Sequence, residues 1–340
     1  MSATSVETLA TAELLQALET DLQVSVLQIK SPEVRAMADM VAYHFGWTEA
    51  NASARGKRVR PLLTMLCCAA AGGNWRHALP AASAVELIHN FSLIHDDIQD
   101  NSAERRGRAT VWKRWGVAQA INTGDALLVL AHLAAHRLAA LGIPLAATLD
   151  VLRLLDEACL HLTRGQHLDL AFESRAEVNE SEYLEMIEGK TAALLSAATT
   201  CGARVAEASE QALEHFRQYG RHLGLAFQIL DDILGIWGAP QVTGKPAGDD
   251  LRAHKKSLPV LFGTQQSAAF LELWAAGSDD EAAIGEMTAA LERAGALEFA
   301  RREAEDHTDQ ALAHLQSAAA EGAAADELRS LTLRLLQRER

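Results

Sequence analysis

The amino-acid sequence predicts an all-α protein of 340 residues. Ala and Leu dominate the composition, and only seven prolines occur. Apolar residues recur at spacings of three and four along nearly the whole chain, as Leu14, Leu18 and Leu22 illustrate. This period places apolar side chains on one face of a helix, whereas alternating β-branched runs of strand length are scarce. With no short internal repeat and no linker, we expect one domain over residues 1–340, with residues 1–10 flexible.

Glycine, proline and polar residues divide this domain into predicted helices. One helix opens at about Glu33, directly after Ser31 and Pro32. The others are expected at residues 12–27, 62–71, 78–100, 109–120, 125–141, 145–173, 181–200, 209–235, 260–274, 279–294 and 297–337, the last with a break near Gly322. Residues 238–258 are rich in Gly, Pro and charge, so we expect an ordered functional loop there.

The bulk composition excludes several classes of protein. A formal net charge of −14 argues against a nucleic-acid partner, because phosphate backbones need clustered Lys and Arg. The N-terminus lacks a basic segment before an apolar run, so no signal peptide is expected. Residues 126–155 are apolar but interrupted by His132, Arg137 and Asp150, which favours a core helix over a transmembrane segment. The four cysteines form no CxxC pair and are typical of free thiols in a reducing, cytoplasmic compartment.

The strongest chemical signal is the run of acids Asp96, Asp97 and Asp100 at the end of a long apolar helix. Positions four apart share a helix face, so Asp96 and Asp100 point the same way and Asp97 is turned aside. Two like charges one turn apart repel each other, and a divalent cation removes that repulsion. Mg²⁺ suits the site because it takes one or two carboxylates together with phosphate oxygens and water.

A second acidic pair, Asp231 and Asp232, also ends an apolar helical run. Bundle cores build metal sites from carboxylates on facing helices. Metal ions bridging the two helices would bind a diphosphate and stabilise it as a leaving group.

Basic residues accompany both acidic motifs. Lys57, Arg58 and Arg60 open one helix, and Arg105 and Arg106 follow the first acidic motif. Lys190 and Lys245 lie on either side of the second motif in the chain, and Lys255 and Lys256 end the polar loop. Each alone is typical of a solvated surface charge, but their placement indicates phosphate binding.

Taken together, these segments resemble the trans-isoprenyl diphosphate synthases, also called polyprenyl synthetases. The matching segments, in the family's order, are GKRVRP (56–61), ELIHNFSLIHDDIQDNSAERRG (86–107), GD (124–125), GQHLDL (165–170), KT (190–191), FQILDD (227–232), GK (244–245) and DLRAHKKSLP (250–259). The resemblance implies an antiparallel helical bundle of the isoprenoid synthase type around a deep central cavity. It also implies a homodimer and three Mg²⁺ ions per active site, for which Mn²⁺ would substitute.

The resemblance further implies a role for each matching residue. The metal ligands would be Asp96, Asp100 and Asp231. The allylic diphosphate would contact Arg105, Lys190, Gln228, Lys245 and Lys255, and isopentenyl diphosphate would contact Lys57, Arg60, His89 and Arg106. Thr191 would orient Lys190, and Asp97, Asp169 and Asp232 would support the metal ligands.

The same resemblance suggests the reaction and the product. The allylic diphosphate ionises, and the isopentenyl double bond attacks the resulting carbocation. Phe91 lies five residues before Asp96, with the small Ser92 beside it and Ile88 a turn deeper. In this family that pattern suggests a geranylgeranyl diphosphate synthase, although core packing alone would also account for Phe91.

Departures from the family pattern leave alternatives open. Gly235 stands where many members have the third Asp of the second motif, Ala109 replaces a common Pro, Trp112 a frequent His, and His254 a usual Gly. A class I terpene cyclase of related fold and a farnesyl or longer-chain synthase are therefore alternatives. So are a non-catalytic subunit of a heteromeric synthase and a helical metal-binding protein.

Overall fold

The computed structural model describes residues 11–29, 31, 34–48, 56–239, 246–318 and 320–336. Helices make up nearly all of this part, which confirms the all-α prediction. The chain forms two compact units. The first comprises Met1–Glu157, Ala197–Phe216 and Ala318–Leu328, and the second comprises Ala158–Ser196, Arg217–Ser317 and Arg329–Arg340. That residues 1–340 form one domain stays a prediction, and the predicted flexible residues 1–10 lie outside the described ranges.

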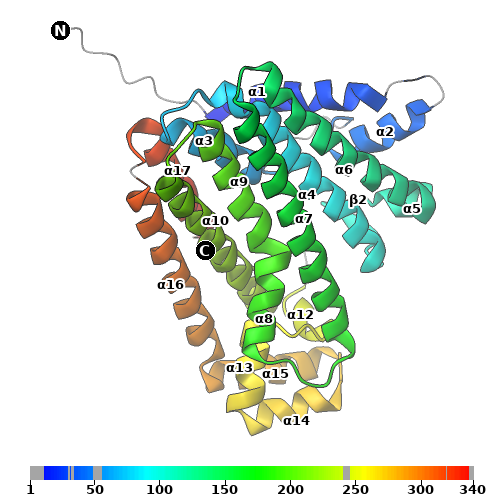
Figure 1. Ribbon diagram of the computed structural model, residues 1–340. Coiled ribbons are helices and arrows are strands. Elements are labelled where there is room, and N and C mark those ends of the chain that lie inside the picture. The colour runs from blue at the N-terminus through cyan, green and yellow to red at the C-terminus, as the bar shows by residue number, and fades with distance from the viewer. Residues whose placement is uncertain are drawn as a thin grey trace. The chain divides into compact units, whose positions relative to one another are not determined.

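The first unit is built on the long helix α4. Its elements are α1 (Thr11–Val26), η1 (Leu27–Ile29), α2 (Arg35–His44), α3 (Val59–Ala70), η4 (Trp75–Ala78), α4 (Leu79–Gln99), β1 (Glu104–Arg105), β2 (Arg108–Ala109), α5 (Val111–Trp115) and α6 (Val117–Ala140). Helix α4 packs against α6, α3 and α1, and Figure 1 shows it beside α6. Pro80 sits in its first turn, where the missing N–H costs no helical bond. Its middle is buried on all sides, as Val85, Leu87 and Ile88 show, so this helix fixes the direction of the acidic motif at its end.

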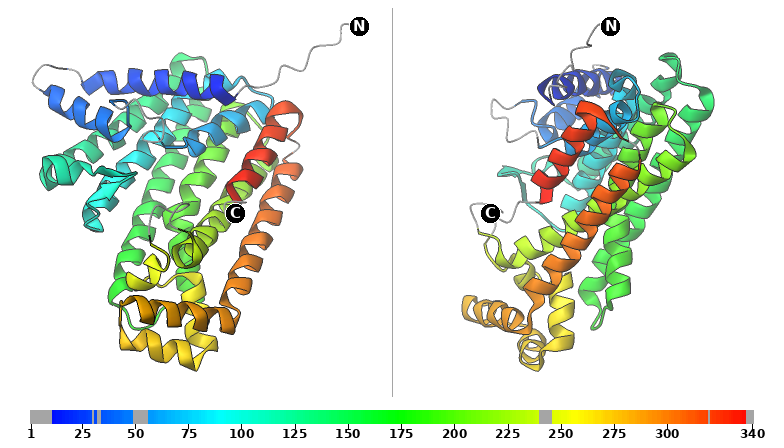
Figure 2. Two further views of the ribbon diagram at one scale, coloured as in Figure 1. Left: turned by 180° about the vertical axis from the view of Figure 1, so that it is seen from behind. Right: turned by 90° about the vertical axis from the view of Figure 1, so that its left-hand side faces the viewer.

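The second unit packs its helices around its own apolar clusters. It contains α8 (Glu180–Ile187), the π-helix η5 (Glu188–Ala192), α12 (Asp249–Arg252), α13 (Leu258–Gln266), α14 (Ala268–Ala276), α15 (Glu281–Ala294) and α16 (Ala296–Ser317). Helix α13 contacts α14, α15 and α16, and Figure 2 shows α13, α14 and α15 as one group. Four helices contribute residues to both units: α7 (Leu145–Ser174), α9 (Ala193–Val205), α10 (Glu210–Trp237) and α17 (Gly322–Leu336).

Several predicted helix boundaries are wrong. The helix expected at 109–120 is instead the end of the β1–β2 hairpin, then α5, a break at Gly116 and the start of α6. Gly116 adopts φ 87° and ψ 159°, which only glycine adopts easily, so the chain turns there. The helix expected at 260–274 is divided at Ser267, whose side chain accepts a hydrogen bond from the Phe270 N–H and caps α14. The break near Gly322 is confirmed, and the helix start expected at Glu33 lies outside the described residues.

Other sequence expectations concern the cysteines and the apolar stretch. All four cysteines are free thiols, and burial raises the pKa of Cys68 and of Cys201 to about 12. Among the described helices, only Val117–Ala140 is long and apolar enough to cross a membrane, and 39% of that window is buried inside the protein. One such helix is weak evidence for a membrane span, because the core helix of a globular protein passes the same test.

Candidate active site

The first acidic motif lies at the C-terminal end of α4, within the first unit. Asp100 caps the helix, and its N–H donates to the Asp96 carbonyl at 2.8 Å. Asp96 is half-buried and Asp100 is exposed, whereas Asp97 is only 1% exposed. As the helical spacing predicts, Asp96 and Asp100 share one side of α4 and Asp97 points into the protein.

A short β-hairpin that the sequence did not reveal holds Asp97. Its turn contains Arg106 and Gly107, both in the left-handed region with φ 54° and 70°. The turn brings Arg105 back to α4, where its Nε donates to Asp97 Oδ1 at 2.8 Å. Burial raises the pKa of Asp97, although the nearby Arg105 opposes the shift. Within the described part of the chain, no hydrogen bond reaches the buried Asp97 Oδ2.

The predicted isopentenyl-site residues gather in the same unit. Arg60 Nη1 lies 3.4 Å from His89 Nε2. The guanidinium of Arg106 packs over Gly56, where a Cβ atom would lie only 2.7 Å from Arg106 Nη2. Burial and then the charges of Arg60 and Arg106 hold the pKa of His89 well below its usual value, so its ring is neutral at pH 7.

Repulsion among these cations is visible in the pKa of Arg106. Burial of its guanidinium and then the nearby charge of Arg58 lower this pKa, although the residue as a whole is exposed. Burial and the charges of Arg106 and Arg105 likewise lower the pKa of His44 to about 3. Electrostatic repulsion of this kind is relieved by an anion, so the cluster favours a negatively charged ligand.

The three residues predicted to set product length lie along α4. Ile88 has no exposed surface, and Ser92 is 6% exposed, with its hydroxyl donating to the His89 carbonyl at 2.8 Å. Phe91 is half-buried, and its ring meets that of His95 edge-on at 4.9 Å. Phe91 is therefore the one of the three whose side chain retains substantial exposed surface.

The second acidic motif lies on α10, within the second unit, and differs sharply between its two members. Asp231 is exposed, whereas Asp232 is buried and receives three hydrogen bonds. The donors are the Tyr183 hydroxyl at 2.7 Å, Gln228 Nε2 at 3.0 Å and the Leu258 N–H at 3.2 Å. Burial and the neighbouring Asp250 raise the pKa of Asp232 to about 7, against the effect of these donors. Asp232 thus fastens α8, α10 and α13 together and leaves Asp231 outward.

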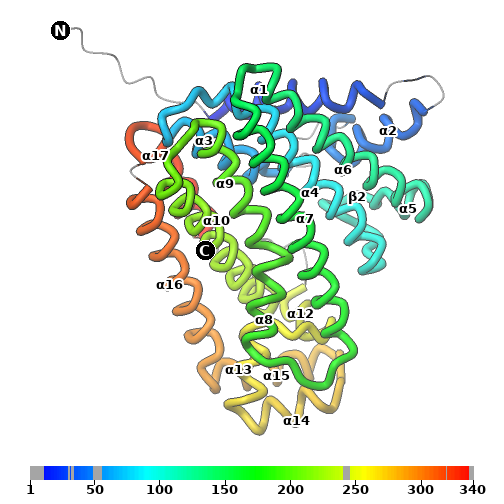
Figure 3. Tube along the Cα trace, in the orientation of Figure 1, coloured from blue at the N-terminus to red at the C-terminus, as the bar shows by residue number. Residues whose placement is uncertain are grey.

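A π-helix presents Lys190 and Thr191. Helix α8 passes into η5 and then α9 with no intervening loop, as the trace in Figure 3 shows. Lys190 Nζ donates to Asp169 Oδ2, while the Thr191 hydroxyl donates to Gln228 Oε1 at 2.6 Å. Thr191, predicted to orient Lys190, therefore contacts Gln228. The π-helix approaches α7 so closely that a Cβ atom on Gly165 would lie 2.1 Å from the Lys190 N atom.

Sequence reasoning missed Asp250, which accounts for the departure at Gly235. A Cβ atom on Gly235 would lie 2.1 Å from Asp250 Oδ2, so the glycine makes room for that carboxylate. Gly235 lies one turn beyond Asp231 on α10, at the position where many family members carry the motif's third Asp. The carboxylate of Asp250, from α12, lies against this position. Lys255 Nζ lies 3.8 Å from Asp250 Oδ1. The signal was present as Asp250 in the segment DLRAHKKSLP, but only the tertiary fold connects it with Gly235.

Lys245 lies outside the described residues. Among those residues, no three His, Cys, Asp or Glu side chains gather closely enough to hold a metal by themselves. Asp96 and Asp100 still fit Mg²⁺, since this ion needs few carboxylates and completes its shell with phosphate oxygens and water.

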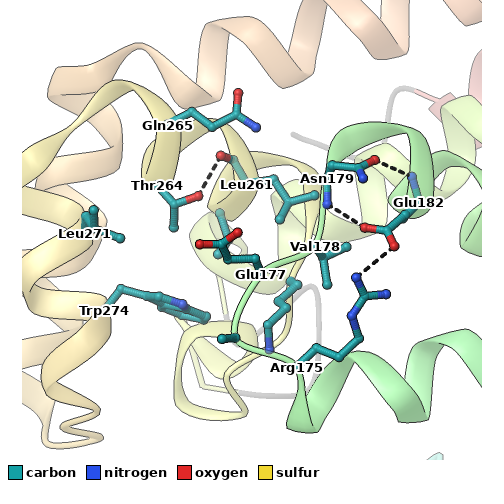
Figure 4. Close-up of a pocket in the computed structure, with 13 residues that line it drawn as sticks. Arg175, Glu177, Val178, Asn179, Glu182, Leu261, Thr264, Gln265, Leu271 and Trp274 are labelled. Carbon is teal, nitrogen blue, oxygen red and sulfur yellow. Dashed lines mark hydrogen bonds and ion pairs between the residues drawn. The ribbon is translucent and has the colours of Figure 1, made fainter.

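The second unit also contains a cavity of about 500 Å³ between the α7–α8 loop, α13 and α14 (Figure 4). Its two cations already have protein partners. Arg175 pairs with Glu182 at 2.8 Å, and Lys256 Nζ donates to the Phe172 carbonyl at 2.6 Å. None of the predicted site residues lines this cavity, so it is separate from the acidic motifs.

Carboxylates that suit Mg²⁺ and guanidinium groups that suit phosphate oxygens, on one helical chain, are typical of an enzyme that acts on a phosphorylated substrate. Comparison with known proteins gives the family. The polyprenyl synthetase family matches residues 45–293. The (2E,6E)-farnesyl diphosphate synthase of Mycobacterium tuberculosis is 42% identical over 308 residues, 84% of each chain. The geranylgeranyl diphosphate synthase of the same organism is 41% identical over 295 residues, covering 83% of this chain and 82% of that protein.

A solved structure agrees. The polyprenyl synthetase from Streptomyces coelicolor A3(2) superposes with a TM-score of 0.85 at 36% identity, over 96% of this chain and 98% of that chain. The protein therefore belongs to the polyprenyl synthetase family of trans-isoprenyl diphosphate synthases. It is a trans-prenyltransferase, from a family that uses a divalent metal, an allylic diphosphate and isopentenyl diphosphate.

Proposed function

We propose that this prenyltransferase makes geranylgeranyl diphosphate by head-to-tail (1′-4) condensation of isopentenyl diphosphate with an allylic diphosphate. The observation that carries the proposal is the cationic cluster of the first unit. There Arg60 lies against a neutral His89, and the charge of Arg106 acts on the same ring. A cyclase that acts on a single prenyl diphosphate has no use for this second anion site, which favours a synthase.

The metal in this proposal is Mg²⁺, with three ions per active site and Mn²⁺ as a substitute. Asp96, Asp100 and Asp231 would hold these ions, and Asp97, Asp169 and Asp232 would support the residues around them. Bound Mg²⁺ would neutralise charge on the diphosphate as it departs. The exposure of Asp231 beside a buried, triply bonded Asp232 supports this division between ligand and support.

The cations of the chain are assigned to the two diphosphates. The allylic diphosphate would contact Arg105, Lys190, Gln228, Lys245 and Lys255, while isopentenyl diphosphate would contact Lys57, Arg60, His89 and Arg106. A neutral His89 donates a hydrogen bond without adding charge, and the guanidinium forks grip phosphate oxygens at two points. These residues would hold both substrates in register, which would lower the barrier by ~7–11 kcal/mol.

The reaction breaks one bond before it forms the next. The C1–O bond of the allylic substrate breaks, and both electrons leave with the diphosphate, whose charge Arg105 and Lys190 would offset. The isopentenyl double bond then attacks C1 of the allylic cation. A proton leaves the resulting tertiary cation for an oxygen of the released diphosphate, which restores a double bond.

Product length is assigned to Phe91, whose half-buried ring stands one turn before the acidic motif on α4. The two named relatives are a farnesyl and a geranylgeranyl diphosphate synthase, and their sequence identities to this chain are nearly equal, at 42% and 41%. They support a short-chain product, and the choice of geranylgeranyl diphosphate depends on Phe91 and Ser92. Farnesyl diphosphate is the second candidate.

We further propose a cytoplasmic homodimer. In the first unit, large apolar side chains remain exposed along α6 and at the start of α7: Val117, Ile121, Val129, Leu133, Leu145 and Leu149. Exposed apolar side chains that recur along one helix suit an interaction surface, and a two-fold dimer is the commonest way to cover one. Sedimentation equilibrium should give twice the 36.7 kDa chain mass, and a monomer would contradict this assignment.

One assay tests the proposed reaction. The purified chain is given labelled isopentenyl diphosphate, Mg²⁺ and in turn dimethylallyl, geranyl or farnesyl diphosphate, and the products are identified by mass. We expect geranylgeranyl diphosphate as the final product. A hydrocarbon or terpene alcohol formed without isopentenyl diphosphate would support the cyclase, and accumulation of farnesyl diphosphate alone would overturn the product assignment.

A further inference from the structure

Arg58 belongs to the basic segment 56–61 but points away from its neighbours' site. Its side chain is only 3% exposed, and it makes two ion pairs inside the first unit. Its Nε donates to Glu19 Oε1 of α1 at 2.7 Å, and its Nη1 donates to Glu86 Oε1 of α4 at 2.8 Å. The guanidinium also lies 5.0 Å from the Phe45 ring centroid and donates to the Phe45 carbonyl at 3.3 Å. Arg58 is therefore an internal anchor.

The backbone of Arg58 is held in a conformation that it would not adopt alone. Its φ of 49° and ψ of 37° lie in the left-handed region, at the N-cap of α3. A non-glycine residue keeps such a conformation only where the surroundings fix it. The buried ion pairs supply that fixation. The turn at Arg58 sets the direction of Lys57 before it and of Arg60 in the first turn of α3.

The anchor and the proposed diphosphate contacts share the same two helices. Glu86 and His89 are three residues apart on α4, so they lie on adjacent turns of one face. Arg58 meets Glu86, and two residues later Arg60 meets His89 at 3.4 Å. Asn90 Nδ2 donates to Glu86 Oε1 at 2.9 Å and so fixes the carboxylate. The pair Arg58–Glu86 thus sets the register in which Arg60 reaches His89.

We propose that Arg58, through Glu86 and Glu19, is a positioning residue for isopentenyl diphosphate binding. This inference rests on the proposed function, because that function assigns Lys57, Arg60 and His89 to the isopentenyl diphosphate. Arg58 touches no substrate. It keeps the turn before α3 in the one conformation that aims Lys57 and Arg60 at the same anion.

The test compares Arg58→Lys and Glu86→Gln with the wild type. Lysine keeps the charge but loses the fork that reaches both carboxylates, and glutamine keeps the shape but loses the charge. We expect the KM and the calorimetric Kd for isopentenyl diphosphate to rise by about tenfold or more in each variant. The KM for the allylic diphosphate should change by less than about threefold, because its proposed contacts lie elsewhere.

A matched control separates positioning from general destabilisation. Arg137 is a half-buried arginine of the first unit that also forms an ion pair, with its Nη2 at 2.6 Å from Asp21 Oδ2. Arg137→Lys should lower the Tm without changing either KM. Equal increases in both KM values for the Arg58 and Glu86 variants, or a lower Tm alone, would overturn the proposal. If Arg58→Lys does not fold, Glu19→Gln, at the more exposed partner, carries the same test.

Failure of the proposed function would give a different result. A wild-type chain that never consumes isopentenyl diphosphate refutes that function, whatever the variants do. The anchor is then judged by calorimetric binding of inorganic diphosphate. Weaker binding to Arg58→Lys than to Arg137→Lys supports the anchor, and equal binding of the two variants overturns it.

Discussion

In each acidic motif, one aspartate is buried and another, within the same helical turn, is exposed to solvent. Asp97 and Asp232 are buried and bonded, whereas Asp100 and Asp231 are exposed. Burying an ionised carboxylate costs free energy unless hydrogen bonds or cations compensate. Arg105 compensates in part for Asp97, and three donors compensate in part for Asp232, since burial still raises the pKa of both carboxyl groups. In the proposed site, the exposed members are the ones that act as metal ligands.

The division of roles predicts the effect of removing a ligand. Asp96→Asn removes the charge but keeps the shape, and we expect kcat to fall by about two to four orders of magnitude with an unchanged Tm. The exposed Asp125, whose side chain is 62% accessible in the same unit, gives the control Asp125→Asn. Steady-state rates at saturating Mg²⁺ measure the effect, and a near-normal rate for Asp96→Asn would refute the metal role.

We expect the side chain of Phe91 to limit the length of the product. Phe91→Ala removes a half-buried ring from α4, and we expect the final product to lengthen by at least one isoprene unit. Mass analysis of products from farnesyl diphosphate and isopentenyl diphosphate measures the change. Phe299→Ala, at a partly buried phenylalanine of the second unit, is the control. An unchanged product distribution for Phe91→Ala would show that Phe91 only packs in the core and does not set the product length.

We expect any side chain at position 235 to clash with Asp250. Gly235→Ala places a methyl group 2.1 Å from Asp250 Oδ2, so α12 or the carboxylate must shift. We expect a loss of about 1–3 kcal/mol in the free energy of unfolding and a lower kcat. Gly285→Ala on α15 meets nothing within 4 Å and should be neutral or stabilising. Urea denaturation compares the two, and equal stability of both variants would show that Asp250 does not need the space.

At the scale of elements, the irregular pieces position the proposed chemistry. The β1–β2 hairpin returns Arg105 to Asp97, and the π-helix η5 carries both Lys190 and Thr191. Single-turn π-helices occur often at functional sites because they shift side chains that a regular helix would place elsewhere. Neither feature has a hydrophobic period, so neither could be predicted from the apolar pattern.

The π-helix depends on a close approach to α7. Gly165→Ala places a methyl group 2.1 Å from the Lys190 backbone N, and backbone cannot give way as a flexible side chain can. We expect a drop of several degrees in Tm and a rise in the KM for the allylic diphosphate, since Lys190 moves. The KM for isopentenyl diphosphate should stay near the wild-type value. If the variant folds and its KM for the allylic diphosphate is unchanged, Lys190 does not bind that substrate.

At the scale of the whole molecule, buried histidines tie stability to pH. Burial and nearby cations lower the pKa of His44 to about 3, and those of His89 and His222 also fall. Between about pH 6.5 and pH 3 the unfolded chain binds a proton at His44 that the folded chain does not. The free energy of unfolding therefore decreases as pH falls through this window.

This linkage can be measured. Between pH 7 and pH 5, His44→Gln should lose about 1–2 kcal/mol less unfolding free energy than the wild type, because it removes one such proton. His77→Gln, at an exposed histidine of η4, is the control and should follow the wild type. Chemical denaturation at the two pH values gives both differences. Parallel loss in all three proteins would mean that His44 is accessible to protons in the folded state.

The sequence by itself determined the helical class, most helix positions and the chemistry. Amphipathic periods and breakers are local, and runs such as 86–107 carry their acids and bases within a few turns. It also predicted that Asp97 turns away from Asp96 and Asp100, because the helix repeat alone decides that. The polyprenyl synthetase match then confirmed the family.

Only the tertiary structure decided which distant groups meet. Arg58 finds Glu19 and Glu86, and Gly235 makes room for Asp250. These partners are separated by 15 to 39 residues in the chain, and no local pattern encodes their contact. A buried charge needs a compensating partner, and the segment that provides this partner is the one that the tertiary fold brings next to it.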